Sequence, residues 1–155
     1  MEFIQLTNTD TLYEEALDLR YELFFREPGL PRDILFDALE KDSVHIAAIH
    51  NGALCAYGRL SEESPRRFKI SQMVVCPKRQ GQGLGTRVLT QLIHIAIEMH
   101  AEEIYLNARL HAVSMYQKLG FEPSGDVFIA TSTGVPHIQM VRRDNMAPRG
   151  TRGCD

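Results

Sequence analysis

Three glycines at alternate positions, Gly81, Gly83 and Gly85, separate two stretches with different hydrophobic patterns. Residues 68–76 form an apolar run that stops at a proline, which predicts a β-strand. After the glycines, apolar side chains recur about every four positions as far as residue 100, which predicts a long amphipathic helix. A strand that turns into such a helix needs a sheet for the helix to pack on. The chain is therefore restricted to folds that combine helices with one sheet.

Other strand patterns occupy the middle and the end of the chain. Val44–His50 and Ala53–Ser61 are apolar runs joined by Asn51-Gly52, a strong hairpin signal because both turn positions need positive φ. A polar break at residues 62–66 separates this hairpin from the strand before the glycines. The remaining predicted strands lie at residues 3–6, 103–108, 127–130 and 137–141, the last two as an antiparallel pair.

Three further helices are predicted. The first runs from Thr11 to about residue 25, with Thr11 and Glu14 as a capping-box pair. A short helix covers residues 33–40, and another covers residues 112–119 and ends at Gly120, the usual C-cap residue. Together these elements predict a mixed α/β or α+β class, built around one sheet.

Length and composition limit the class of protein. The 155 residues are predicted to form one domain, residues 1–144, with a loose tail at 145–155 that is rich in proline and glycine. A net charge of −3 argues against nucleic-acid binding through a broad basic surface. The chain start lacks a signal-peptide pattern, and no apolar run approaches the roughly 20 residues that cross a bilayer. We therefore expect a cytoplasmic protein with no membrane partner.

The three cysteines lack metal-ligand spacing, so we expect no bound metal. Cys55 and Cys76 lie inside apolar stretches and are predicted to be small core residues, whereas Cys154 is expected to be exposed in the tail.

The glycine turn also predicts a binding site. Its backbone can approach a ligand closely, and the helix start that follows offers free N–H groups and a positive dipole end that suit a diphosphate. Packing alone could also require the glycines. A P-loop is excluded because Thr86-Arg87 stands where Lys-Ser/Thr is needed, and Thr86 occupies the third glycine position of a dinucleotide fingerprint.

The turn resembles motif A of the GNAT superfamily of acetyltransferases, Gln/Arg-x-x-Gly-x-Gly/Ala, with Gln80, Gly83 and Gly85 at its fixed positions. Residues 112–121 are similar to the family's second signature, which ends Tyr-x-Lys-Leu-Gly-Phe. A weaker resemblance, to the ElaA-like branch, rests on short stretches that include residues 58–60 and 134–140. In that branch the position of Arg109 often carries glutamine. The polar contact that the branch makes at this position is therefore not assigned to Arg109.

The resemblance implies acetyl-CoA as co-substrate. It also implies a GNAT-type α+β domain, with one mixed, largely antiparallel sheet flanked by helices. In that sheet the strands at residues 68–76 and 103–108 are expected to lie parallel and to splay apart around the pantetheine arm. The coenzyme-binding residues that it implies are Met73, Val74, Val75, Arg79, Gln80, Gly81, Gln82, Gly83, Leu84, Gly85, Thr86 and Tyr116.

The resemblance further implies direct transfer of the acetyl group to a primary amine of a small molecule or peptide in a ternary complex. The backbone N–H of Val75 is then the donor to the oxyanion. Tyr116 is predicted to protonate the departing thiolate, because a phenol with a pKa of about 10 keeps its proton at neutral pH. Alternatively, Tyr116 packs on its helix with the hydroxyl bonded elsewhere.

Two histidines could be the catalytic base, since both could titrate near neutral pH: His137 and His111. Either could instead be structural. Glu22 and Glu27 lie in the helical region that the family places beside the acceptor, although a solvated helix face explains them better.

Other charged and titratable residues are less informative. Arg20 and Arg59 could bind an acidic acceptor or form surface ion pairs. The remaining histidines have no chemical partner that the sequence reveals: His45, His50, His94 and His100.

Two other functional classes stay open. One is a non-catalytic acyl-CoA-binding module that senses the coenzyme, and the other is an acyltransferase with a different acyl donor or a hydroxyl acceptor. We also expect a homodimer, because a two-fold partner would cover the unpaired edge strands at the C-terminal end of the sheet.

Overall fold

The computed structural model describes residues 1–131 and 133–143, so the predicted tail and Cys154 lie outside the described residues. The contacts divide the chain into two compact units. The first unit consists of Met1–Ser61 with Ile70–His94, and the second of Glu62–Lys69 with the chain from Ile95 onward. No helix in the described part of the chain is long and apolar enough to span a membrane.

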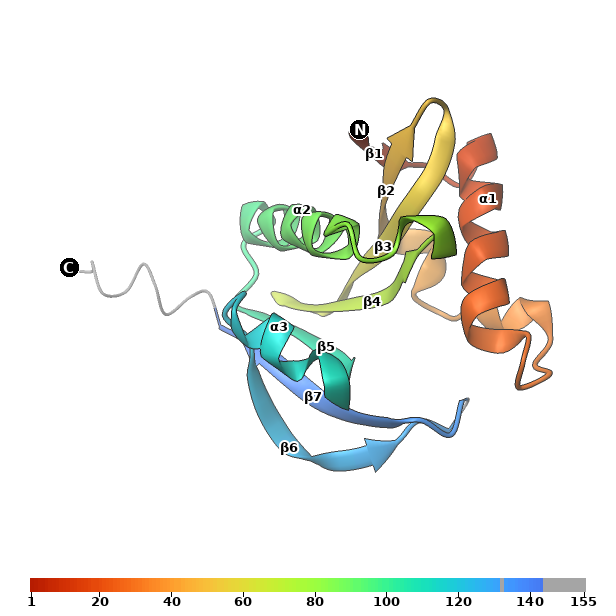
Figure 1. Ribbon diagram of the computed structural model, residues 1–155. Helices are drawn as coiled ribbons and strands as arrows, with labels where there is room; N and C mark the ends of the chain where they lie inside the picture. The colour runs from red at the N-terminus through yellow and green to blue at the C-terminus, as the bar shows by residue number, and fades with distance from the viewer. Residues whose placement is uncertain (132, 144–155) are drawn as a thin grey trace. The chain divides into compact units, whose positions relative to one another are not determined.

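Seven strands are hydrogen-bonded in the order β1-β2-β3-β4-β5-β7-β6 (Figure 1). Most recorded pairings are antiparallel, whereas β4 and β5 run parallel through Arg67–Lys69 and Glu103–Tyr105. The α+β class and the mixed, largely antiparallel sheet are thereby confirmed, and the splay beyond the parallel pairs stays a prediction. The strands are β1 Glu2–Leu6, β2 Val44–His50, β3 Ala53–Ser64, β4 Arg67–Val75, β5 Glu103–Arg109, β6 Glu122–Ile129 and β7 Pro136–Arg142.

The helices are α1 Thr11–Arg20, α2 Leu84–Glu98 and α3 Val113–Gln117, and a π-helical turn, Tyr21–Phe25, continues α1. Short 3₁₀ turns occupy Arg32–Leu35, Glu40–Asp42, Pro77–Arg79 and Leu110–Ala112.

Two helix predictions were wrong. Asp10, not Thr11, is the N-cap of α1, and its carboxylate accepts a hydrogen bond from the Thr7 N–H at 2.7 Å, so no capping box forms. The predicted helix at 33–40 is broken because the Asp37 carboxylate binds the Leu39 N–H at 3.0 Å, a local contact that competes with helix formation.

In the first unit, α1 and α2 cover opposite faces of the strands (Figure 1). Ala16 of α1 packs in a buried cluster with Tyr57 and Val74. On the other face, a Cβ at Gly58 would lie 2.8–2.9 Å from side-chain atoms of Leu92 and Val88 in α2. Tyr57 and Gly58 are neighbours in β3, and successive residues of a strand face opposite sides of the sheet. The strand therefore gives each helix a surface to pack on.

In the second unit, β5 contributes the buried side chains of Ile104 and Leu106, and Met140, which is paired with Leu106, is fully buried. Phe121, the residue before β6, is also fully buried. The strand β6 begins five residues earlier than predicted. Every residue of β6 is exposed and the register shifts between Ser124 and Phe128, so no alternating pattern marks its first half.

Candidate coenzyme and catalytic site

The glycine turn owes its shape to two residues in the left-handed region. Gly81 and Gly83 both have φ of +80°, and a Cβ at either position would meet nothing within 4 Å. The backbone conformation, rather than crowding, therefore demands glycine here. At Gly85 a Cβ would make an ordinary contact, 3.6 Å from the Val75 side chain. The turn thus presents bare backbone beside open space.

Hydrogen bonds fix this turn between β4 and α2. The Gln80 side-chain amide donates to the Val75 carbonyl at 3.3 Å, and the Arg79 N–H donates to the Cys76 carbonyl at 2.8 Å. The Arg87 N–H binds the Gly83 carbonyl at 3.1 Å, which begins the α2 ladder. All the predicted coenzyme residues from 73 to 86 therefore lie together in the first unit.

Tyr116 lies in α3 of the second unit. Burial raises the pKa of its phenol above the usual value of 10.0. Its ring packs edge-on against Phe121, with centroids 6.1 Å apart. The raised pKa means that the phenol keeps its proton at neutral pH. No side chain or carbonyl among the described residues hydrogen-bonds its hydroxyl.

The two predicted bases also lie in the second unit. The ring of His137 stacks on Phe128, and its Nδ1 lies 2.8 Å from the Val135 carbonyl. Because a carbonyl only accepts, Nδ1 carries the proton in the neutral ring, and the lone pair is on Nε2. His111 is exposed in the turn Leu110–Ala112. Arg109 is paired with His137 in the β5–β7 register, so this departure from the ElaA-like pattern lies next to a predicted base.

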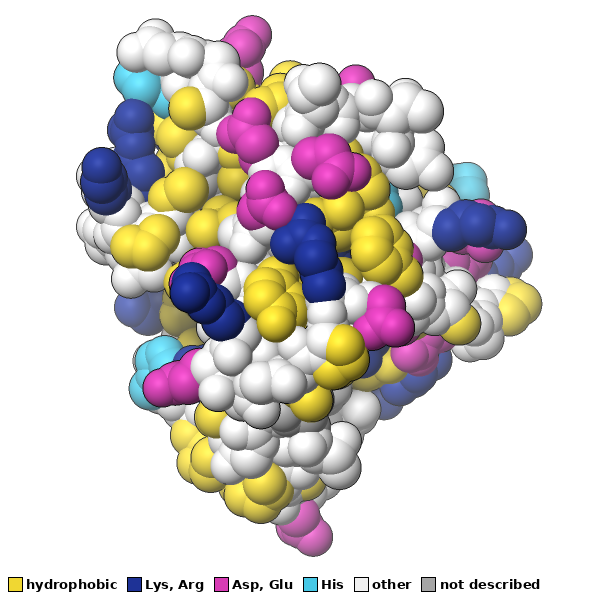
Figure 2. Space-filling model, turned by 90° about the vertical axis from the view of Figure 1, so that its right-hand side faces the viewer, with side chains coloured by type: hydrophobic (Ala, Val, Ile, Leu, Met, Phe, Trp, Pro, Cys, Tyr) yellow, Lys and Arg dark blue, Asp and Glu magenta, His cyan; other side chains and the backbone are white. Residues whose placement is uncertain are grey.

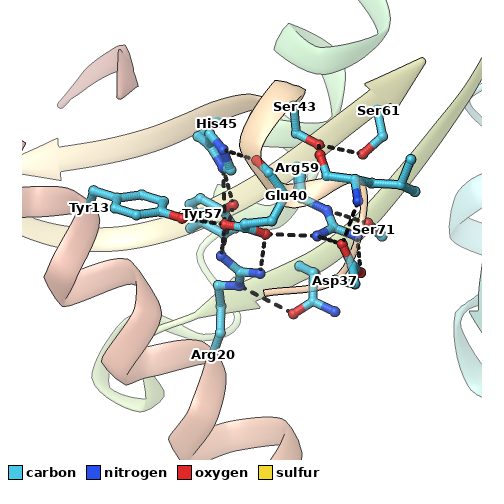
Figure 3. Close-up of polar contacts among 12 residues, drawn as sticks. Tyr13, Arg20, Asp37, Glu40, Ser43, His45, Tyr57, Arg59, Ser61 and Ser71 are labelled. Atoms are coloured by element: carbon cyan, nitrogen blue, oxygen red, sulfur yellow. Dashed lines mark hydrogen bonds and ion pairs between the residues drawn. The ribbon is translucent and has the colours of Figure 1, made fainter. Parts of the chain in front are cut away.

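Sequence analysis missed a buried ionic network in the first unit, formed by Tyr13, Arg20, Asp37, Glu40, His45, Tyr57, Arg59, Ser71 and Gln72 (Figure 3). The surface placement expected for Arg20 and Arg59 was wrong, since their side chains are 0% and 2% exposed. Both arginines bind Glu40, whose side chain is 4% exposed. A guanidinium buried with a carboxylate in this way is not available to an acidic acceptor.

Glu40 accepts four hydrogen bonds at the centre of the buried ionic network. Arg20 donates to both carboxylate oxygens at 2.8 Å, Arg59 donates at 2.7 Å, and the Tyr13 hydroxyl donates at 2.6 Å. Burial by itself raises the pKa of Glu40, but these hydrogen bonds and the positive charge of Arg20 outweigh it and lower the pKa to about 2. Glu40 is therefore ionised at neutral pH.

His45 closes the other side of the network. Its Nε2 donates to the Glu40 carbonyl at 3.1 Å, so Nδ1 of the neutral ring accepts from the Tyr57 hydroxyl at 2.5 Å. Burial lowers the pKa of His45, and the charges of the two arginines act in the same direction. The histidine that seemed to lack a partner is thus a neutral structural residue.

A pocket of about 380 Å³ opens in the first unit, between α1 and the neighbouring ends of β3 and β4. Figure 2 shows the face of the molecule that bears α1, where acidic side chains border hydrophobic ones. Two of the lining acids form surface ion pairs, Asp18 with Arg32 and Glu22 with Arg26. The lining residues are Glu15, Asp18, Leu19, Glu22, Leu54 and Cys76.

Cys76 is half-buried at this pocket rather than in the core, whereas Cys55 is buried as predicted. Burial raises the pKa of the Cys76 thiol, so it stays protonated at neutral pH. Within the described residues, no three His, Cys, Asp or Glu side chains are grouped to hold a metal ion.

Residues 9–121 match the Acetyltransferase (GNAT) family, and the chain therefore belongs to it. The uncharacterized N-acetyltransferase YjcF of Bacillus subtilis is 26% identical over 129 residues, which cover 83% of this chain and 91% of YjcF. The crystal structure of Escherichia coli ElaA superposes with a TM-score of 0.78 at 26% identity, covering 92% of this chain and all of ElaA.

A third relative shares the fold at lower identity. This GNAT acetyltransferase from Elizabethkingia anophelis, solved with acetyl-CoA bound, gives a TM-score of 0.71 at 16% identity and covers 92% of this chain and 97% of its own. The predicted membership of the GNAT family is confirmed.

Proposed function

We propose that this protein is an N-acetyltransferase that moves the acetyl group of acetyl-CoA directly to a primary amine of a small molecule or peptide. The observation that carries the proposal is the glycine turn, where Gly81 and Gly83 leave bare backbone and open space at the start of α2. Such a cradle suits a diphosphate, and a GNAT relative of the same fold binds acetyl-CoA. The chain's membership of an acetyltransferase family supports the same conclusion.

The proposal assigns two segments to the coenzyme. The backbone of Met73, Val74 and Val75 would pair with the pantetheine arm. The turn Arg79–Thr86 would bind the diphosphate through its N–H groups, with the positive end of the α2 dipole behind them. Bound acetyl-CoA would supply an activated acetyl group at the end of the pantetheine arm.

The chain's own residues would then transfer protons at two places, the acceptor nitrogen and the departing sulfur. An alkylamine is mostly protonated at pH 7, so a base must take one proton before the nitrogen can attack, and the nitrogen loses a second proton to water as the amide forms. His137, with its lone pair on Nε2, and His111 are the two groups proposed for this step. The N–H of Val75 would stabilise the oxyanion, and Tyr116 would give its proton to the departing thiolate as the C–S bond breaks.

The acidic pocket supports an acceptor that carries positive charge. Its lining combines the apolar side chains of Leu19 and Leu54 with carboxylates of α1. Glu15 has no ion-pair partner among the described residues, so its charge is open to a ligand. Surface carboxylates raise the local concentration of a cationic substrate.

The direct test is turnover of acetyl-CoA with a panel of amines, measured as the release of free thiol. We expect release that depends on the amine, and a preference for acetyl over longer acyl groups. Acetyl-CoA binding without turnover on any amine or alcohol would favour a sensor module instead. Turnover with an alcohol, or a preference for a longer acyl-CoA, would favour the other acyltransferase alternative.

The edge strand β6 supports the proposed homodimer. It ends the sheet order, and Val127 and Ile129 are 52% and 57% exposed. An edge strand that exposes apolar side chains is usually covered, and a second copy can pair with it about a two-fold axis. Light scattering at micromolar concentration should give twice the mass of one chain. A monomer under those conditions would exclude the dimer.

A further inference from the structure

One residue in the middle of β4 has a backbone conformation that a strand does not normally contain. Gln72 has a φ of +59°, in the left-handed region that is rare for a residue with a side chain. It immediately precedes Met73–Val75, the segment assigned to the pantetheine arm. Something in the surrounding structure must hold Gln72 in this conformation.

Gln72 reverses the alternation of side chains along β4. Ser71 and Gln72 are neighbours, yet both reach the buried ionic network: Ser71 Oγ accepts from Arg59 Nε at 3.1 Å, and Gln72 Oε1 accepts from Arg20 Nε at 3.2 Å. In a regular strand these two side chains would lie on opposite faces of the sheet. Here they lie on the same face, the one that α1 covers.

The residues after Gln72 show the consequence. Met73 Sδ lies with Val88 and Leu92 on the α2 face, 2.5 Å from where a Cβ of Gly58 would be. Val74 packs with Ala16 on the α1 face. Val75 again lies on the α2 side, against the glycine turn. Regular alternation from Ser71 onward would exchange the faces of all three residues.

The network holds Ser71 and Gln72 through two arginines that are themselves fixed. Arg20 and Arg59 come from different elements, α1 and β3, and Glu40 holds both by short hydrogen bonds. Each arginine keeps its Nε for β4, one for Ser71 and one for Gln72. Because both guanidinium groups are buried and bound on their other side, they have little freedom to follow a strand that slips.

We propose that Arg20 is a positioning residue for the coenzyme strand: its hydrogen bond keeps Gln72 left-handed and thereby sets the faces on which Met73, Val74 and Val75 project. This inference rests on the proposed function, which assigns those three residues to acetyl-CoA. The same network that stabilises the first unit also sets the register of its coenzyme-binding strand.

The test compares two single variants at adjacent positions. Gln72→Ala removes the acceptor but keeps a Cβ in the left-handed conformation, whereas Ser71→Ala removes the Arg59 contact at a residue with ordinary φ. By calorimetry, Gln72→Ala should weaken acetyl-CoA binding by about tenfold, the population shift expected when a left-handed residue loses its support. Ser71→Ala should bind within about twofold of the parent, as expected when an ordinary strand residue loses one contact. Gln72→Gly, which tolerates positive φ, should recover part of the affinity.

The Met73 methyl resonance gives a readout that needs no coenzyme. Its chemical shift should change in Gln72→Ala and stay the same in Ser71→Ala. Arg20→Lys keeps a cation beside Glu40 but loses the guanidinium fork, so it should weaken binding as Gln72→Ala does, and adding it to Gln72→Ala should weaken binding little further.

Folded Gln72→Ala with parent affinity and an unmoved Met73 resonance would overturn the inference. Equal effects in Gln72→Ala and Ser71→Ala would also overturn it, because the role would then be general stability. A parent protein that does not bind acetyl-CoA would contradict the proposed function instead, and the Met73 resonance would still decide whether Arg20 sets the strand.

Discussion

The glycine turn and the buried ionic network lie in the same unit but use polar groups in opposite ways. The turn is contiguous in sequence, and its backbone at Gly81 and Gly83 faces open space. The network is assembled from residues 13 to 72, and its charged centre is almost completely buried. The turn leaves its N–H groups for a ligand, whereas the network pairs its polar groups with one another. The network can therefore influence chemistry only by holding other residues in place.

The largest expected effect is loss of coenzyme binding at the turn. In Gly83→Val a branched side chain would fill the diphosphate cradle, so acetyl-CoA affinity should fall below detection by calorimetry. The forced positive φ should cost only about 1–2 kcal/mol of the free energy of unfolding.

The matched control is Gly52→Val. Gly52 has φ of +78° and open space around its Cβ position, as Gly83 does, but it lies in the β2–β3 hairpin. It should lose similar stability and keep its affinity. If Gly83→Val binds acetyl-CoA as the parent does, the turn is not the diphosphate site.

At the network, Glu40→Gln should lower the free energy of unfolding by about 3–5 kcal/mol, because it leaves two buried arginines without a counter-charge. The comparison is Glu22→Gln, which breaks an exposed pair with Arg26 and should cost less than about 1 kcal/mol. Urea denaturation measures both. Equal losses in the two variants would mean that the network stabilises the unit no more than a surface pair does.

Two tyrosines allow the same comparison between a free polar group and a paired one. Tyr116→Phe removes a hydroxyl that no described residue binds, so turnover should fall by roughly 10²–10³ while acetyl-CoA affinity and stability change little. Tyr57→Phe removes a hydroxyl that His45 and Arg20 bind, so it should cost about 1–2 kcal/mol of stability. Near-normal turnover in Tyr116→Phe would show that water or another group protonates the thiolate.

The network should also make the protein sensitive to acid. The pKa of Glu40 is lowered from 4.5 to about 2, so its contribution to stability is complete above pH 4.5 and is lost as the pH falls toward 2. Within that window the loss is about 1 kcal/mol per pH unit. His45, whose pKa is also lowered, adds a loss that begins as the pH falls below about 6.5, the ordinary value for histidine.

A carbon NMR titration of the Glu40 carboxyl measures this directly, with a midpoint near pH 2 expected. A midpoint near 4.5 would mean that the arginines do not hold the carboxylate in its ionised form. Denaturation at several pH values should show the matching decline in the free energy of unfolding.

Features that are local in sequence could be predicted. Asn51-Gly52 forms the hairpin, with φ of 51° and 78°, and the strand, glycine turn and long helix follow in the expected order. The length of the second strand of the β2–β3 hairpin was nevertheless underestimated, since β3 continues to Ser64 through polar residues. Its extension is exposed, so no apolar alternation marked it.

The network could not be predicted because its members are distant in sequence and charged residues on helices usually face water. One signal was present. Tyr13, Ala16, Leu17 and Arg20 recur at helical spacing and are all buried in α1, so Arg20 occupies the apolar face. His45 and Arg59 likewise interrupt apolar strands. A charged residue at an apolar position of a pattern indicates a buried partner, but the pattern does not say which one.

The smallest expected effect separates two neighbouring carboxylates on α1. Glu15 lines the acidic pocket, and its charge adds to burial in raising the pKa of the Cys76 thiol, whereas Glu14 is exposed on the same helix and does not line the pocket. Glu15→Gln should raise KM for a cationic acceptor about two- to fivefold, a loss below about 1 kcal/mol, with kcat unchanged. Glu14→Gln has the same change of charge and should leave KM within error. The difference should shrink as salt is added, because exposed charges are screened over about 8–10 Å at ordinary ionic strength. Equal effects of the two substitutions would mean that only the overall negative charge of α1 attracts the acceptor, and no effect of either would place the acceptor outside this pocket.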